Sequence, residues 1–255
     1  MNGSSLRYEV IEDPSSFDNG ENARMAEEWT SLAASACLGC DKEQAGVRSA
    51  WQLFFGNPEE QPCCFDRLVS VRNEAGQLVS FSAVRRLTVE SRPVLYWSFA
   101  MTHPHYQRST VTACSWTHML NPDYLRKFAG GYIAARTANP LVYRLAQFKV
   151  AASAKRAGLL AQLYPEIVSP TANRQIPAHI RQVGQALVPP GDGKPRLDED
   201  TFVIKEAFRR YGTLYDDYSF YSRDPVVGSY FRDNILFRTR DGMLLLWELA
   251  PPADQ

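Results

Sequence analysis

The stretch Ala100–Thr112 reads AMTHPHYQRSTVT and joins two segments of different character. The run before it, Pro93–Met101, is apolar on both faces, as expected for a strand in the middle of a sheet. The segment after it, Thr110–Leu120, has the pattern of a helix. We therefore expect a central strand, a loop and then a helix at this point of the chain.

Upstream, the apolar residues change from a helical to a strand period. Leu6–Ile11 alternates and predicts a short strand, and two helices are expected at Asn22–Leu38 and Glu43–Phe55. The β-branched runs Phe65–Val71 and Leu78–Val89 flank a loop that ends in glycine, which indicates a hairpin.

Downstream, Gly131–Ala135 predicts a short strand. Asn139 followed by Pro140 then indicates a helix start, with Asn as N-cap and Pro at the first position. We expect the inward face of this helix to carry four side chains, which are Val142, Leu145, Ala146 and Lys149.

The remainder predicts an insertion and a closing hairpin. Helices are expected at Gln175–Leu187 and Asp198–Arg210 within an insertion covering about 155–225. Ile235–Phe237 and Met243–Leu249 flank Asp241 and Gly242, the strongest short hairpin signal in the chain, so a hairpin is expected over about 233–249.

This order predicts an α/β fold with a central mixed sheet and helices on both faces. We expect one domain over residues 1–255, with a core at about 64–150, the helical insertion and the C-terminal hairpin.

Composition excludes several classes of function. Lys plus Arg and Asp plus Glu each number 28, so the net charge is zero, which argues against a protein that grips nucleic acid or a membrane over a broad surface. No apolar run reaches 18 residues, and no basic segment followed by an apolar one marks a leader. Five cysteines without framework spacing fit a reducing compartment, so we expect a cytoplasmic protein. The oligomeric state is not predicted.

A second stretch, Tyr132–Leu145, reads YIAARTANPLVYRL, with a tyrosine four residues after the asparagine of an Asn-Pro pair. Together with Ala100–Thr112 and the order of elements, it resembles the GNAT superfamily of acyl-coenzyme A dependent N-acyltransferases. The resemblance covers about residues 64–150. It implies a GNAT-like sheet and use of acetyl-CoA or another acyl-CoA, or of a thioester carried on a protein.

The resemblance places the coenzyme's pyrophosphate at the loop that enters the helix. A helix N-terminus offers unpaired backbone N–H groups and a positive dipole end, which suit an anion. The family usually has glycine at three of these positions, here Arg108, Thr110 and Thr112, and three side chains would narrow the cradle. A different thioester or a vestigial site therefore stays open. The residues implied are Gln107, Arg108, Ser109, Thr110, Val111 and Thr112.

The resemblance also implies the catalytic groups. Backbone N–H groups near Met101 and Thr102 would stabilise the oxyanion, and Tyr143 would protonate the leaving thiolate. Asn139 would cap its helix or contact the pantetheine arm. The alternative for Tyr143 is an ordinary core tyrosine.

No general base is assigned. Glu90, His103, His105 and His118 lie near the loop and its helix in sequence, and His103 with His105 is expected to shape the turn.

Other sequence patterns give weaker indications of function. Cys37, Cys40 and the adjacent pair Cys63 and Cys64 could be taken as zinc ligands, but adjacent cysteines do not easily reach one tetrahedral ion, so no metal is predicted. The aromatic and acidic segment Tyr211–Tyr230 either packs on the sheet or lines a pocket for an amine. No Gly-x-Ser-x-Gly, Gly-x-Gly-x-x-Gly or Walker motif occurs.

We therefore expect an N-acyltransferase that moves an acyl group from a thioester to a small-molecule amine by direct attack in a ternary complex. The alternatives are a GNAT-shaped protein that only binds a small molecule or a partner, and one that runs another reaction on a coenzyme A ester, such as hydrolysis or decarboxylation.

Overall fold

The computed structural model describes residues 5–38, 45–107, 109–189, 191, 194–208, 224–236 and 240–252, without the side chains of 37, 38 and 45–47. The chain divides into two compact units, which are described separately. The first holds the described residues up to Arg85 and Trp97–Met119, and the second holds Arg86–Tyr96 and those from Leu120 on. The single-domain organisation stays a prediction.

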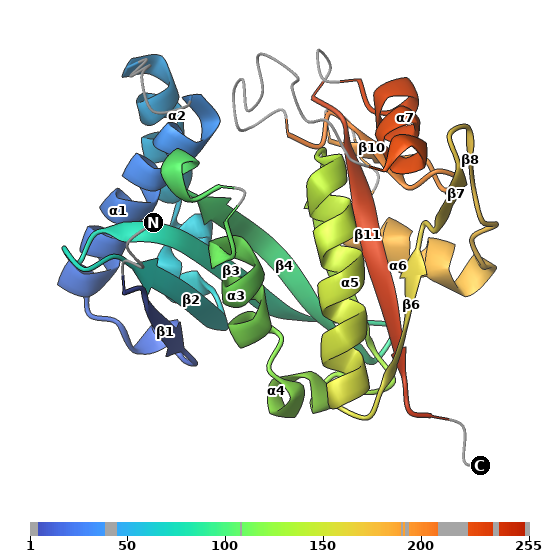
Figure 1. Cartoon of the computed structure of the whole chain (residues 1–255), viewed down its shortest axis with the longest axis horizontal. Coiled ribbons are helices and arrows are strands. Elements are labelled where there is room, and N and C mark those ends of the chain that lie inside the picture. Colours follow the sequence, from blue (N-terminus) through green and yellow to red (C-terminus); the bar gives the residue numbers. More distant parts are fainter. Residues whose placement is uncertain are drawn as a thin grey trace. The chain divides into compact units, whose positions relative to one another are not determined.

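The first unit contains the strand order β1–β2–β3–β4 and three helices (Figure 1). β1 pairs with β2, and β2 with β3, in antiparallel register, with Tyr8 opposite Val71 and Val69 opposite Ser82. Short turns of 3-10 helix lie at Pro14–Ser16, Pro58–Glu60, Pro62–Cys64 and Pro104–Tyr106. The elements are β1 (Arg7–Ile11), α1 (Asn19–Leu38), α2 (Ala45–Phe55), β2 (Arg67–Arg72), β3 (Leu78–Val89, to Arg85 in this unit), β4 (Arg92–Thr102, from Trp97 in this unit) and α3 (Val111–Met119).

Two neighbouring residues of β3 place α1 and α3 on opposite faces of the first unit's strands. Phe81 stacks on Trp29 of α1, with ring centroids 4.3 Å apart and planes 7° apart. The next residue, Ser82, lies 3.1 Å from the hydroxyl of Ser115 in α3. Successive side chains of a strand point to opposite faces, so α1 covers one face and α3 the other.

The second unit is built around β11, which is apolar on both faces. β5 pairs antiparallel along one edge of β11, with Leu245 opposite Ala135. β10 and β6 share the other edge, β10 at its start and β6 at its end. The elements are α4 (Pro122–Arg126), β5 (Tyr132–Thr137), α5 (Pro140–Arg156), β6 (Leu160–Tyr164), β7 (Ile167–Ser169), β8 (Ala172–Asn173), α6 (Ala178–Leu187), β9 (Arg196–Leu197), β10 (Val203–Lys205), α7 (Pro225–Asn234) and β11 (Gly242–Ala250).

Helices cover both faces of β11. Figure 1 shows α5 in front of the strand and α6 behind it, and both contact it. Leu244 and Leu246 join one buried cluster with Ile180 and Val183 of α6. Because side chains alternate along β11, Leu245 points to the opposite face, where it is also buried, so both faces of the strand are buried. The predicted mixed α/β fold with helices on both faces is confirmed.

The boundaries of most predicted elements agree with the structure, and β3 matches its predicted range, Leu78–Val89. Asn139 caps α5 as expected, because its side chain accepts a hydrogen bond of 2.9 Å from the N–H of Leu141.

The prediction of which side chains of α5 face inward was wrong, because the helix is rotated about its axis relative to the predicted orientation. Val142, Leu145 and Lys149 are only half-buried, and Ala146 is the one predicted residue that is buried. The side chain that turns inward is Tyr143, which packs on Phe231 of α7 at 5.8 Å between centroids. The buried residues of α5 are Pro140, Tyr143, Ala146, Val150, Ser153 and Ala154.

The helix predicted at Asp198–Arg210 is also wrong as far as the structure describes it. Val203–Lys205 is a strand, β10, whose partners are β11 and β9. Phe202 before it has a positive φ of 56°, which ends any helical path, and its ring is fully buried. The insertion therefore contains β6–β10 as well as helices.

The closing hairpin is the third correction. Asn234 ends α7, and Ile235 and Leu236 are not in a strand. Asp241 is buried instead: its carboxylate accepts hydrogen bonds from the ammonium of Lys205 at 2.8 Å and from the N–H of Glu206 at 3.1 Å. A Cβ at Gly242 would lie 2.6 Å from the Phe208 ring. Within the described residues, the Asp-Gly pair therefore joins β11 to β10, and the predicted hairpin strand is absent at Ile235 and Leu236; Phe237 lies outside the described residues.

No helix among the described residues combines the length and the apolar character needed to cross a bilayer.

The substitution Gly131→Ala tests the close approach of β4 and β5 in the second unit. A Cβ at Gly131 would lie 2.0 Å from the carbonyl oxygen of Pro93, so the backbone must move. We expect the free energy of unfolding to fall by about 2 kcal/mol or more, measured by urea denaturation followed by circular dichroism. Gly20→Ala is the control, because its nearest neighbour is the flexible carboxylate of Asp18 at 3.2 Å, and it should not destabilise. Equal urea midpoints for Gly131→Ala and Gly20→Ala would contradict the close contact between Gly131 and Pro93.

Candidate functional site

The loop between β4 and α3 lies in the first unit, and hydrogen bonds hold its described residues. β4 ends at Thr102, and the N–H of His103 donates to the carbonyl oxygen of Val79 at 2.9 Å. The ring of His103 then caps the turn at Pro104–Tyr106, since its Nδ1 accepts from the N–H of His105 at 3.3 Å. The prediction that these histidines shape the turn is confirmed for His103.

Three hydroxyl groups connect the end of β4 to the first turn of α3. Ser80 donates to the carbonyl oxygen of Met101 at 2.9 Å, and its oxygen lies 3.0 Å from that of Thr102. The hydroxyl of Thr102 lies 2.9 Å from that of Thr112. A hydroxyl has a single proton. Thr102 therefore donates to Ser80, and Thr112 donates to Thr102. We name Ser80, Thr102 and Thr112 the hydroxyl chain.

The start of α3 offers backbone donors. The hydroxyl of Ser109 donates to the carbonyl oxygen of Tyr106 at 2.5 Å and accepts the N–H of Val111 at 3.2 Å. The helical bonds begin with the N–H of Cys114, which donates to Thr110 at 2.8 Å. The N–H groups of Thr112 and Ala113 precede that bond, so the helix itself gives them no acceptor.

The alternation of β4 separates the two predicted oxyanion donors. The N–H of His103 points to β3. Because alternate residues of a strand point their N–H groups to the same neighbour, the N–H of Met101 is expected to point to β3 as well, and that of Thr102 to the opposite edge. The carbonyl of Thr102 is taken by Nε2 of Gln107 at 3.0 Å. This geometry favours Thr102 over Met101 as the donor to a ligand.

The end of β4, the loop that follows and the first turn of α3 thus carry most of the predicted site residues, which are Met101, Thr102, Gln107, Ser109, Thr110, Val111 and Thr112. The side chain of Val111 is buried, and Ser109 and Thr110 are exposed. Arg108 lies outside the described residues. Asn139 and Tyr143 belong to the second unit.

Tyr143 is held by two hydrogen bonds in the interior of the second unit. Its side chain is 1% exposed. The hydroxyl donates to the carbonyl oxygen of Pro165 at 3.1 Å and accepts the N–H of Ile167 at 3.2 Å. Burial raises the pKa of this phenol above its ordinary value, against the smaller lowering by the Ile167 bond. The arrangement is that of an anchoring core tyrosine, and the catalytic acid role stays a prediction.

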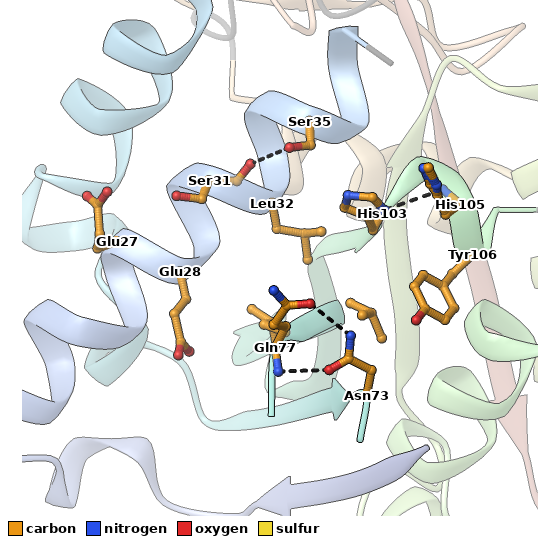
Figure 2. Close-up of a pocket in the computed structure, with 12 residues that line it drawn as sticks. Glu27, Glu28, Ser31, Leu32, Ser35, Asn73, Gln77, His103, His105 and Tyr106 are labelled. Carbon is orange, nitrogen blue, oxygen red and sulfur yellow. Dashed lines mark hydrogen bonds between the residues drawn. The ribbon is translucent and has the colours of Figure 1, made fainter. Parts of the chain in front are cut away.

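A pocket of about 560 Å³ lies in the first unit between α1, the β2–β3 turn and the end of β4 (Figure 2). Leu32 extends from α1 into it, and Asn73 and Gln77 lie opposite. Nδ2 of Asn73 donates to Oε1 of Gln77, and Oδ1 of Asn73 accepts the backbone N–H of Gln77, both at 3.0 Å. The lining residues are Glu27, Glu28, Ser31, Leu32, Ser35, Asn73, Gln77, Leu78, Val79, His103, His105 and Tyr106.

The sequence did not single out most of this lining. His103 and His105 were named, but the serines of α1 and the Asn73–Gln77 pair were not. Ser31 and Ser35 stand four residues apart beside the apolar stripe that contains Leu32, which was the available signal.

The two histidines of the pocket stack on each other at 5.2 Å between centroids, with planes 16° apart. Burial lowers the pKa of His103, and the neighbouring charge of His105 lowers it further. His103 is therefore neutral near pH 7 and, because its Nδ1 accepts a hydrogen bond, carries its proton on Nε2.

Within the part of the chain that the structure describes, no group of three or more His, Cys, Asp or Glu side chains is arranged to hold a metal ion. Of the candidate zinc ligands, Cys40 and the side chain of Cys37 lie outside that part.

No family model matches the chain, and no curated protein matches it. It is similar to solved structures of GNAT-family acetyltransferases, at TM-scores below 0.5. One is the diaminobutyrate acetyltransferase EctA from Paenibacillus lautus in complex with L-2,4-diaminobutyric acid and coenzyme A, with 12% identity over 64% of this chain and 83% of that one, and a TM-score of 0.37.

Two further solved structures are similar at the same level. A putative GNAT-family acetyltransferase from Desulfovibrio desulfuricans is 13% identical over 62% of this chain and 87% of that one, with a TM-score of 0.38. The GNAT-family N-acetyltransferase YhbS from Escherichia coli in complex with CoA is 12% identical over 61% of this chain and 68% of that one, with a TM-score of 0.34.

The substitution Tyr143→Phe separates the two roles of this residue. It removes both hydrogen bonds of the hydroxyl, so we expect a loss of about 1–3 kcal/mol in unfolding free energy, measured by urea denaturation. If Tyr143 is also the acid, kcat for thiol release falls at least 10-fold in the fraction of the variant that is folded. Phe148→Leu is the control, since Phe148 is 68% exposed on the same helix.

The substitution His105→Gln tests the coupling of the stacked histidines. We expect the pKa of His103, measured by NMR titration of the ring signals, to lie below its ordinary value of about 6.5. Removing the charge of His105 should raise it part of the way back, because burial remains. His179→Gln, in the second unit, should leave it unchanged. A His103 pKa that does not respond to His105→Gln would contradict the assignment.

Proposed function

We propose that the chain is a GNAT-like N-acyltransferase, which moves an acyl group from an acyl-CoA thioester to a small-molecule amine in a ternary complex. The observation that carries this proposal is the loop after β4, where hydroxyl groups and open backbone N–H groups gather at the first turn of α3. In the reaction, the amine nitrogen attacks the thioester carbonyl, a C–N bond replaces the C–S bond, one proton leaves the nitrogen, and the thiolate takes one.

The first turn of α3 suits a pyrophosphate despite its lack of glycine. The N–H groups of Thr112 and Ala113 and the positive end of the helix dipole favour an anion there. Thr110 is exposed and adds a hydroxyl donor. Side chains thus take the place of the close backbone approach that glycine allows.

The hydroxyl chain supports this use because its direction can reverse. When an anion accepts the proton of Thr112, Thr102 turns to donate to Thr112, and Ser80 turns to donate to Thr102. One neutral bond, to the carbonyl oxygen of Met101, is exchanged for a charge-assisted bond to the anion. The side chains in place of glycine leave less room for the pyrophosphate, and this stronger hydrogen bond compensates in part for the resulting loss of binding free energy.

The N–H of Thr102 is the proposed donor to the oxyanion that forms during attack. It is expected to point away from β3, and Gln107 and the hydroxyl chain hold the residue in place. A donor that is fixed before the reaction stabilises developing charge without reorganisation. Asn139 as a pantetheine contact and Tyr143 as the acid remain predictions, and the acceptor base is not assigned.

The second candidate is a protein of this shape that binds a small molecule without acyl transfer. The three side chains at Arg108, Thr110 and Thr112, in place of glycine, favour it. Calorimetric titration with CoA and acetyl-CoA separates the two. Saturable binding together with amine-dependent thiol release supports the transferase, and absence of both supports the second candidate.

The substitution Thr112→Val tests the proposed pyrophosphate site. It removes the hydroxyl and keeps the side-chain shape, so we expect the Kd for CoA to rise about 5- to 10-fold, or roughly 1 kcal/mol, by calorimetry. Dephosphorylated pantetheine thioester, which has no pyrophosphate, should bind both forms equally. Thr117→Val in the same helix is the control, because its hydroxyl donates to Ala113 within α3. Equal CoA affinities for the two variants would place the anion elsewhere.

A further inference from the structure

The pocket beside the end of β4 combines an apolar wall with neutral polar groups. Leu32, Leu78 and Val79 form apolar surface, and the polar side chains come from three separate elements. Figure 2 shows Leu32 reaching from α1 toward Gln77, with the Tyr106 side chain across the pocket. Apolar walls with a few placed polar groups are typical of sites for small molecules.

The carboxylates at the rim are already paired. Glu28 accepts two hydrogen bonds from Arg72, at 2.6 and 3.1 Å, and one from Arg24 at 3.3 Å. Glu27 is paired with Arg48. As far as the described residues line it, the pocket therefore offers no excess negative charge, and a polycation would meet arginines next to each carboxylate.

The neutral groups keep unused hydrogen-bonding capacity. Gln77 accepts from Asn73 through Oε1, and within the described residues its Nε2 has no hydrogen-bond partner. The same holds for the hydroxyls of Ser31 and Tyr106 within that part of the chain. Neutral His103 adds an Nε2–H donor. Two hydroxyls that can both donate and accept, together with two N–H donors beside an apolar wall, match a molecule that carries many hydroxyls on a carbon frame.

We propose that this pocket binds a small polyhydroxylated amine, the acceptor of the acyl group. Its volume of about 560 Å³ holds a molecule with six or so carbon atoms and their hydroxyls. Recognition comes from the hydroxyls and not from the charge of the amine. The acceptor role rests on the proposed function, whereas binding itself does not.

The test uses three probes of similar length and calorimetry on the full chain. 1-Amino-1-deoxy-sorbitol has hydroxyls and an amine, sorbitol has only hydroxyls, and spermidine has only amines. We expect saturable binding of the first two, with spermidine at least 10-fold weaker. Spermidine binding as tightly as aminodeoxysorbitol, or no binding of either polyol, would overturn the proposal.

Variants locate the binding. Ser31→Trp fills the pocket from the half-buried face of α1 and should weaken aminodeoxysorbitol binding at least 10-fold. Gln77→Ala removes the free amide and should weaken it about 5-fold. Leu53→Trp is the control, because Leu53 is 79% exposed on α2 outside the pocket. Equal effects of Ser31→Trp and Leu53→Trp would also overturn the proposal.

Thiol release from acetyl-CoA separates this proposal from the proposed function. Polyol binding that depends on Ser31, without thiol release, supports the pocket and removes the transferase. Thiol release with spermidine that is unaffected by Ser31→Trp supports the transferase and removes the pocket as acceptor site.

Discussion

The hydroxyl of Thr102 is the point on which the candidate site depends. It lies between Ser80 of β3 and Thr112 of α3, so the last residue of one strand is tied to its neighbour and to the helix that follows. Phe81 and Ser82 place α1 and α3 on opposite faces of the same strands. As a result, the first turn of α3 lies on the α3 face of the first unit's strands, and the pocket lies on the α1 side of the same strand end.

Much of the fold could be predicted because its elements carry their own signals. The strand Leu78–Val89 and the capped helix after Asn139 depend on local period and local hydrogen bonds. The predictions fail where residues distant in sequence determine the local structure. Val203–Lys205 is a strand only because β11 and β9 lie beside it. Asp241 and Gly242 have hairpin chemistry, but the ion pair of the buried Asp241 carboxylate with the half-exposed Lys205 and the packing of Gly242 against the ring of Phe208 account for them.

The candidate site divides in the same way. The loop Gln107–Thr112 is a continuous stretch, so its role as a helix entry could be predicted from order and spacing. Tyr143 has the spacing of a catalytic group, yet its hydroxyl is bonded to Pro165 and Ile167, whose position no local pattern reveals. The pocket unites Ser31 with Gln77 across 46 positions of sequence, and only the packing of α1 brings them together.

The buried carboxylate of Asp241, which directly precedes β11, limits which substitutions this sequence can accept during evolution. Asp241 is 1% exposed and neutralised by Lys205. Loss of the lysine alone would leave a buried carboxylate with the N–H of Glu206 but without its opposite charge, whereas replacement of both residues would remove both charges together. Among relatives of this chain, the two positions should therefore covary, exchanged as a pair for uncharged residues or kept as a pair, with single replacements purged.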